Sequence, residues 1–295
     1  MTTDDFNPDS ISELTFTDIS LGPVYLVSRN LERTINAYSD FLGFEILKQD
    51  DDYISFGLDG KEILNFKIDP DARAKAPTDA GLYHIAILLP ERRDLAKFVQ
   101  MLIDSNIRFA SADHLVSEAI YLYDSDGLGI EVYWDKPSSE WVWENDKVKM
   151  DTLPIDIDVL LDEIEDINDV WDGVPAGTKI GHIHLQVPDL KTAEDFYTKT
   201  LGLNLTSTFP GALFLAADGY HHHIGLNNWH TKGIAQSDDN VAGLRAFDIT
   251  IPDPTIFESF KRRVSKLQPN IGINDNEIEL RDILNNRILV KTLSE

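Results

Sequence analysis

The most informative stretch of the chain is Ile180-Gly181-His182-Ile183-His184-Leu185-Gln186-Val187-Pro188-Asp189-Leu190, which reads as a strand that carries histidines and then runs into a helix. A second copy lies upstream, where Gly81-Leu82-Tyr83-His84-Ile85-Ala86-Ile87-Leu88-Leu89-Pro90 places a histidine six residues before a proline, as His182 lies six before Pro188. A lone histidine in a strand is more often a core or surface residue than a ligand. Two histidines at equivalent points of a repeat therefore make the stronger site hypothesis.

The residues around these strands belong to a larger unit. From Val24 onward the pattern predicts a strand, a helix that stops near Gly43, and three short strands at 45–48, 53–58 and 62–68. The unit is a strand, a helix and three further strands.

This unit recurs along the chain, which is the strongest organisational signal in the sequence. Residues 197–203 repeat 38–44 at a constant offset from the preceding strand, and 243–252 match 81–90. In the second and fourth units, helices are expected at 94–104 and 255–267. The sequence therefore predicts four βαβββ modules, near 20–69, 80–136, 179–229 and 242–293.

Four regions follow from the repeat. In chain order they are an N-terminal extension, modules one and two, an acidic linker, and modules three and four, at 1–19, 20–136, 137–178 and 179–295. Apolar spacing over 155–167 of the linker predicts a helix packed on the outside of the domains, with a partner-binding helix as the alternative. The predicted class is α+β, with two pseudo-symmetric domains of curved sheets.

The composition narrows the function classes. Lys and Arg total 26 against 51 Asp and Glu, and the formal charge of −25 should repel nucleic acid and anionic membranes. No apolar run approaches the about 20 residues of a membrane span, and the first residues lack a signal-peptide pattern, so we expect a cytoplasmic protein. With no cysteine, any metal must be held by imidazole and carboxylate, which suits iron or manganese better than structural zinc.

Three motifs together resemble the vicinal oxygen chelate superfamily, which includes glyoxalase I, fosfomycin resistance enzymes, bleomycin-binding proteins and type I extradiol dioxygenases. They are the stretch at 181–190, Asp113-His114-Leu115-Val116-Ser117-Glu118-Ala119-Ile120-Tyr121-Leu122-Tyr123-Asp124-Ser125-Asp126-Gly127-Leu128-Gly129-Ile130-Glu131, and Tyr220-His221-His222-His223-Ile224-Gly225-Leu226-Asn227. They most resemble the two-domain bacterial catechol 2,3-dioxygenases, from about residue 20 to the end. The resemblance implies that two modules pair and curve around a metal, each offering positions on its first and last strands.

Matching the modules to that plan gives a candidate ligand set of His84, Glu131 and His182. The histidines lie on the first strands of modules two and three, and Glu131 lies on the last strand of module two. Equivalent positions in modules one and four hold Pro23, Ala246 and Leu289. We therefore expect modules two and three to pair around the metal, and modules one and four to form a metal-free partner domain.

Two histidines and one carboxylate leave three open positions on a metal, an arrangement suited to Fe(II), with Mn(II) or another divalent ion as alternatives. The resemblance implies extradiol cleavage of a catechol-like aromatic diol by O2. Two other functions stay open: a glyoxalase-type metal-dependent isomerase or lyase, and a non-enzymatic aromatic-ligand binder of the bleomycin-resistance kind. The expected partners are a small aromatic substrate and O2, with no nucleic acid and no membrane, and a homo-oligomer is possible.

The resemblance also implies catalytic residues. His223 is expected to be the acid/base group, with His222 as the alternative, and Tyr121 and His114 are expected to hydrogen-bond the substrate or the oxygen adduct. His184 shares a strand face with His182 and is expected to line the cavity or to support a ligand. Three tryptophans could wall an aromatic pocket or pin the linker: Trp141, Trp143 and Trp229.

Overall fold

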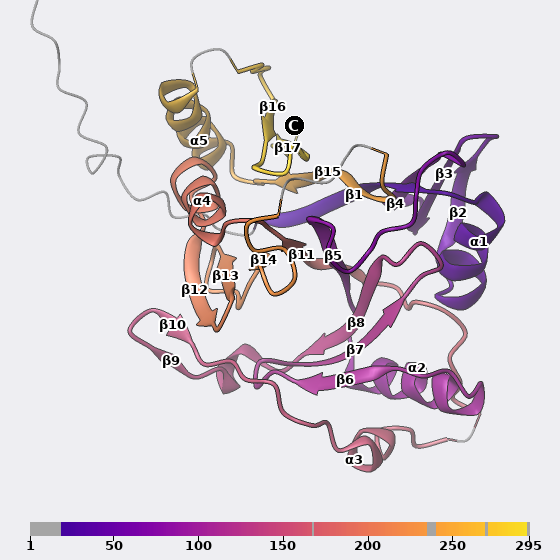
Figure 1. Ribbon diagram of the computed structural model, residues 1–295. Coiled ribbons are helices and arrows are strands. Elements are labelled where there is room, and N and C mark those ends of the chain that lie inside the picture. Colours follow the sequence, from indigo (N-terminus) through magenta and orange to yellow (C-terminus); the bar gives the residue numbers. More distant parts are fainter. Residues whose placement is uncertain (1–18, 167, 235–239, 269–270, 294–295) are drawn as a thin grey trace, which may run out of the picture.

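A computed structural model describes residues 19–166, 168–234, 240–268 and 271–293. Nearly all of the predicted N-terminal extension lies outside these ranges. Two large sheets carry the described chain, and helices lie along their outer sides (Figure 1).

The first two modules keep the predicted order of elements. Module one contains β1 (Ser20–Ser28), α1 (Leu31–Ile35), the π-helical η2 (Asn36–Phe41), β2 (Glu45–Gln49), β3 (Tyr53–Leu58) and β4 (Lys61–Ile68). Module two contains β5 (Gly81–Leu88), α2 (Arg92–Asp104), β6 (Ala110–Asp113), β7 (Ser117–Tyr123) and β8 (Gly129–Asp135). The strand predicted at 53–58 has these bounds, because turn-forming residues stand on both sides of it.

Module three also follows the unit, and module four departs from it. Module three contains β11 (Lys179–Gln186), α4 (Leu190–Asp195), the π-helical η4 (Phe196–Thr200), β12 (Asn204–Phe209), β13 (Ala212–Ala216) and β14 (Ile224–Asn227). Module four contains β15 (Gly243–Thr250), α5 (Pro254–Leu267), β16 (Glu277–Arg281) and β17 (Arg287–Lys291). In its described part only two strands follow the helix, because 274–276 read Asn-Asp-Asn and favour a turn, so that Ile273 makes a single bridge to Ile278.

The linker holds short elements only. These are η3 (Ser138–Glu140), the hairpin of β9 (Trp143–Glu144) and β10 (Lys147–Val148), and α3 (Ile157–Leu161). Helix α3 is shorter than the predicted 155–167, and the amides of Glu163 and Ile164 bond three residues back, as in turns. The acidic residues that follow Leu161 would extend a helix with negative charge at its C-terminus, which the helix dipole disfavours.

The strand order shows which modules share a sheet. The eight-stranded sheet runs β12-β13-β14-β11-β5-β8-β7-β6 and joins modules two and three. The seven-stranded sheet runs β16-β17-β15-β1-β4-β3-β2 and joins modules one and four. In each sheet the two modules are joined by an antiparallel pair of strands, β11 with β5 in one sheet and β1 with β15 in the other. Residues far apart in sequence therefore meet on the central strands.

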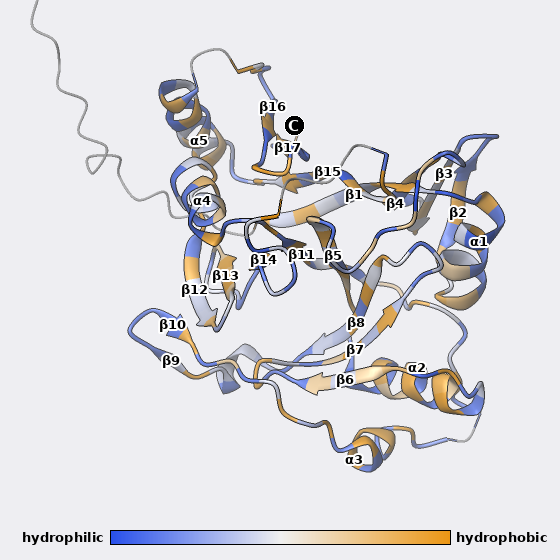
Figure 2. Cartoon of the chain, in the orientation of Figure 1, coloured by the Kyte–Doolittle hydropathy of each residue, from blue (hydrophilic) through white to orange (hydrophobic). Residues whose placement is uncertain are grey.

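Helix α2 is amphipathic and buries its apolar side. On α2, Leu95, Phe98 and Leu102 recur at helical spacing and are fully buried, and Figure 2 shows hydrophilic and hydrophobic segments on this helix. Burying a side chain such as Phe98 contributes about 1.5–3 kcal/mol. None of the described helices combines the length and apolar character that crossing a membrane requires.

Helix α4, which was predicted to follow the strand at 180–187, begins after the capping residue Asp189. The Asp189 side chain accepts a hydrogen bond from the Thr192 amide at 2.7 Å, and Pro188 precedes it. Such a cap satisfies an amide that the first helical turn leaves unpaired. The proline and the aspartate therefore end β11 and turn the chain into α4.

Candidate active site

Three predicted ligand residues converge on the central strands of the eight-stranded sheet. His84, Glu131 and His182 lie on β5, β8 and β11, which are neighbouring strands. Glu131 Oε2 lies 2.9 Å from His84 Nε2 and 3.1 Å from His182 Nε2, and the two imidazole nitrogens are 3.3 Å apart. The three donor atoms could hold one metal ion, and each of the three side chains is buried.

The electrostatics of this cluster favour the protonation states that bind metal. Burial alone would raise the pKa of Glu131, but His182 and His84 hold it well below its ordinary value. Burial lowers the pKa of His182 to about 4, although Glu131 opposes this shift. At neutral pH the cluster thus offers an ionised carboxylate and an unprotonated His182, which are the forms in which these groups ligate metals.

A missing side chain makes the approach of His84 to the neighbouring strand feasible. A Cβ at Gly129, directly opposite His84 on β8, would lie 2.9 Å from His84 Cβ and 2.1 Å from the Tyr83 carbonyl oxygen. Only glycine fits this contact without a shift of the backbone. The glycine therefore lets β5 pair closely with the strand that carries Glu131.

The three residues line a cavity of about 650 Å³. This volume is within the range of about 300–1,000 Å³ that holds small-molecule ligands. Its walls are mainly apolar and aromatic, and include Phe109, Leu122, Ile130, Phe209, Phe214 and Trp229. The cavity can therefore enclose a planar organic molecule next to the three donor atoms.

Tyr121 and His114 form a hydrogen-bonded pair on the wall of the same cavity. Tyr121 lies opposite Glu131 in the β7–β8 ladder, and its hydroxyl is 2.7 Å from His114 Nε2. His114 Nδ1 lies 2.8 Å from the carbonyl oxygen of Asp151, which can only accept, so Nδ1 carries the proton and Nε2 accepts from the Tyr121 hydroxyl. Burial, followed by Glu131, raises the pKa of Tyr121 well above its ordinary value. Tyr121 therefore remains a neutral phenol.

His184 lies in the cavity wall and outside the three-residue cluster. It pairs with His84 across β11 and β5, with the rings 4.8 Å apart. Its Nε2 accepts a hydrogen bond from the Asn227 side-chain amide at 3.1 Å. This nitrogen is thus occupied, and His184 packs beside His84.

The three consecutive histidines, His221 to His223, do not share one environment. Residues 221–223 form a bend before β14 begins, so the alternation of a strand does not apply to them. His222 lines the large cavity and its ring lies 4.1 Å from that of His182. His223, expected as the acid/base group, instead lines a second cavity, and its Nδ1 accepts from the Ala217 amide at 3.3 Å. The resemblance pointed to the second histidine of the pair, whereas the bend turns the first one inward.

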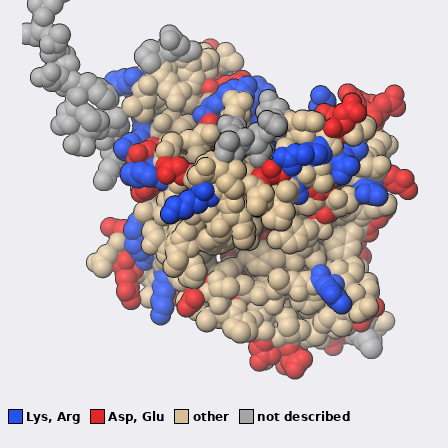
Figure 3. Space-filling model, viewed as in Figure 1, with Lys and Arg blue, Asp and Glu red and all other residues tan. Residues whose placement is uncertain are grey.

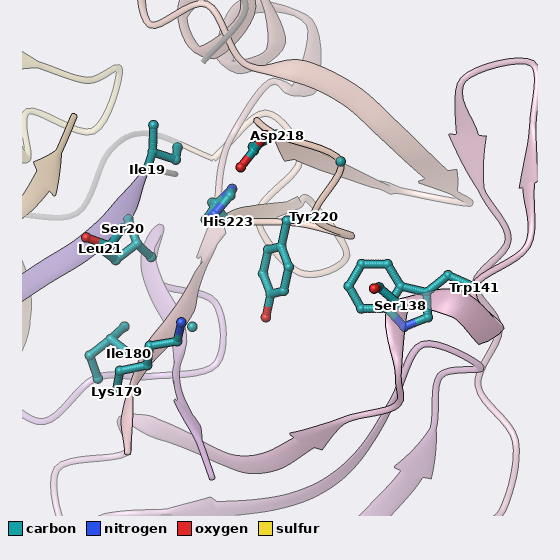
Figure 4. Close-up of a pocket in the computed structure, with 12 residues that line it drawn as sticks. Ile19, Ser20, Leu21, Ser138, Trp141, Lys179, Ile180, Asp218, Tyr220 and His223 are labelled. Carbon is teal, nitrogen blue, oxygen red and sulfur yellow. The ribbon is translucent and has the colours of Figure 1, made fainter. Parts of the chain in front are cut away.

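The second cavity has a volume of about 290 Å³ and lies between β11, the start of β1 and the loop before β14. Figure 4 shows His223 and Tyr220 reaching into it from one side and Trp141 from another. Of the three tryptophans, Trp229 lines the large cavity, Trp141 lines the second, and Trp143 is on the linker hairpin. The separate position of His223 removes it from contact with a ligand in the large cavity.

Acidic residues outnumber basic residues in this chain, but they are not concentrated at the three-residue cluster. Figure 3 shows them mainly at the margins of the face drawn, with an extensive uncharged surface at its centre. Glu131 is the one carboxylate in the three-residue cluster. The net charge of −25 is therefore compatible with a largely apolar binding cavity.

Comparison with known proteins identifies the family. Residues 20–132 and 179–251 match the model described as the Glyoxalase/Bleomycin resistance protein/Dioxygenase superfamily. The chain belongs to this superfamily. A catechol-2,3-dioxygenase of Bacillus subtilis (strain 168) is 37% identical over 270 residues, which cover 90% of this chain and 94% of that protein. The predicted family is thus confirmed.

Solved structures of low sequence identity share the architecture of this superfamily member. A protein of Bacillus subtilis subsp. subtilis str. 168 matches with a TM-score of 0.62 at 13% identity, over 95% of this chain and 86% of that one. Glyoxalase I of Zea mays matches with a TM-score of 0.54 at 14% identity, over 93% and 92% of the two chains. These matches confirm the predicted fold class.

Proposed function

We propose that this protein is an extradiol dioxygenase, which uses a divalent metal, Fe(II), to cleave a catechol-like diol with O2. The spacing of the three donor atoms carries the proposal. For metal–ligand bonds of about 2.1 Å, neighbouring ligands of an octahedral ion lie about 3.0 Å apart, and those of a tetrahedral ion about 3.4 Å. The observed separations of 2.9, 3.1 and 3.3 Å are closer to the octahedral arrangement.

His84, Glu131 and His182 would therefore hold the ion on one face. Two imidazoles and one carboxylate are the donor set of ferrous oxygenases, and they leave the opposite face open. When bound there, iron would supply Lewis acidity and electron conduction between the diol and O2. The buried position of the three side chains would keep bulk water from a bound ion.

The aromatic wall supports a planar diol as the substrate. The Bacillus subtilis relative is named a catechol-2,3-dioxygenase, and its similarity extends over nearly the whole chain. In the proposed reaction one ring C–C bond next to the diol breaks and both atoms of O2 enter the product. A catechol gives a ring-opened hydroxy-acid semialdehyde, with no other reductant required.

Two groups beside the donor cluster are placed to handle protons and oxygen atoms. We assign His222 the role of acid/base group in place of His223, because His222 lines the cavity beside His182. Burial lowers the pKa of His222 well below its ordinary value, so it enters the reaction as a neutral base that can take a diol proton. Tyr121, fixed by His114, presents its phenol oxygen to the same space.

The other two functions find less support. Glyoxalase-type relatives usually carry a fourth protein ligand on the last strand of the paired module, where this chain has Leu226 and Asn227, and Asn227 is bonded to His184. A binder without a metal would bury these three ionisable groups with no metal to stabilise them, and such burial lowers the stability of the fold.

Oxygen uptake after anaerobic loading with Fe(II) tests the proposal. We expect uptake on addition of catechol and air, with His182→Ala abolishing it. His222→Gln should lower kcat by about 10²–10⁴-fold, the usual worth of an acid/base group. His223→Gln is the matched control and should stay near wild type. Tight metal binding with no uptake on any catechol would contradict the proposal, and a loss in the control variant alone would return the role to His223.

A further inference from the structure

A chain of hydrogen bonds connects the cavity histidine to a carboxylate on another module. His222 Nδ1 lies 2.7 Å from His221 Nδ1, and His221 Nε2 lies 2.8 Å from Asp135 Oδ1. His221 is completely buried, and Asp135 ends β8, the strand that also carries Glu131. One strand thus contributes both a proposed metal ligand and the anchor of the acid/base residue.

Tyr220 binds the second oxygen of the same carboxylate, and Tyr133 binds Tyr220. The Tyr220 hydroxyl lies 2.8 Å from Asp135 Oδ2 and 2.8 Å from the Tyr133 hydroxyl. Because a carboxylate only accepts, Tyr220 donates to Asp135 and so must accept from Tyr133. Tyr220 also stacks on His221, with ring centroids 4.1 Å apart, and forms part of the second cavity (Figure 4). Both oxygens of Asp135 are therefore held, and the carboxylate has a fixed orientation.

Asp135, the acceptor at one end of this series of hydrogen bonds, determines which nitrogen of each histidine carries the proton. Asp135 Oδ1 requires a donor, so His221 carries its proton on Nε2. A neutral His221 then has a lone pair on Nδ1, and the short contact to His222 requires His222 to donate from its own Nδ1. This leaves His222 Nε2 without a proton, and no other described side chain bonds to that nitrogen.

We infer that Asp135, acting through His221, holds His222 in the one tautomer whose free Nε2 lone pair can take a substrate proton. Asp135 and His221 are positioning residues, since neither lines the large cavity. The same logic operates in hydrolase triads, where a carboxylate fixes the tautomer of a catalytic histidine. The inference rests on the proposed function for its catalytic meaning, but the tautomer itself is a property of the protein without substrate.

Spectra of isotope-labelled histidine nitrogens measure the tautomer directly. In the wild-type protein near neutral pH we expect His222 protonated on Nδ1 and His221 on Nε2, with signals assigned through His222→Gln. Asp135→Asn should shift His222 toward the Nε2-protonated form, because an amide nitrogen can donate to His221. Asp282→Asn is the matched control: it makes the same substitution at a buried carboxylate that binds the Tyr197 hydroxyl, away from these histidines, and should leave both tautomers unchanged.

Kinetics of the iron-loaded enzyme provide the second readout. Asp135→Asn should lower kcat by about 10²-fold or more while KM stays within about twofold, as for a wrong tautomer in a triad. Iron content should not change, because Asp135 is not one of the donors. An Nε2-protonated His222 in the wild type, or an unchanged tautomer in Asp135→Asn, would overturn the inference. An inactive wild type with the expected tautomers would count against the proposed function and leave the positioning intact.

Discussion

Gly181 precedes His182, and the space that a side chain would take there is filled by the Tyr133 hydroxyl. A Cβ at Gly181 would lie 1.8 Å from that oxygen and 2.8 Å from the ring carbon that bears it. The hydroxyl is in turn bonded to Tyr220. Gly181 thus permits the contact between β11 and the side chains around Asp135.

Gly181→Ala should lower the free energy of unfolding by about 1–3 kcal/mol, the usual cost of overpacking a core. In a double-mutant cycle with Tyr133→Phe, part of this cost should disappear, because the clashing oxygen is gone. Urea unfolding of the four proteins measures the coupling. Strictly additive effects would show that the alanine is accommodated elsewhere.

At the scale of elements, the strands could be predicted from the sequence, but the orientation of side chains at the strand ends could not. His84 and His182 could be chosen because they occupy equivalent positions of repeated strands. Glu131 could be chosen because the resemblance implies a ligand on the last strand of a module. His222 could not be distinguished from His223, since both lie in a bend where no periodicity indicates which side chain turns inward. The role of Asp135 was also missed, because its contact with His221 joins residues of different modules.

The start of α4 gives a prediction for a single element. Asp189→Ala removes the side-chain acceptor of the Thr192 amide and should cost about 0.5–2 kcal/mol of stability. Asp189→Asn is the control and should retain most of it, since an amide oxygen still accepts. Denaturant midpoints compare the three proteins. Equal losses in both variants would show that the negative charge near the helix N-terminus matters more than the cap.

At the scale of the whole molecule, the eight-stranded sheet joins the two middle modules and the seven-stranded sheet joins the first and the last. The repeat predicted four modules, and the described part of module four departs from the unit because only two strands follow its helix. What the sequence could not supply was the enclosure of the cavity, because the wall combines side chains from both middle modules and the linker. Burying several histidines in this enclosure also makes the stability of the protein depend on pH.

His223 illustrates this dependence away from the donor cluster. Burial lowers its pKa to about 3, below the about 6.5 of an unfolded chain. The unfolded state therefore binds more protons between these values, and stability falls as the pH decreases from about 6.5 toward 3. His223→Gln should make this slope shallower, by up to about 1.4 kcal/mol per pH unit. Equal slopes in the wild type and in His223→Gln would contradict the assignment.

Under the proposed function, His84, Glu131 and His182 hold a metal that directs ring cleavage by O2. Mass spectrometry of the product formed from catechol and isotopically labelled O2 by the iron-loaded protein tests it most directly. We predict a ring-opened semialdehyde that carries both labelled oxygen atoms, and none from His182→Ala. An unopened ring, or a product that gains no label, would contradict the account.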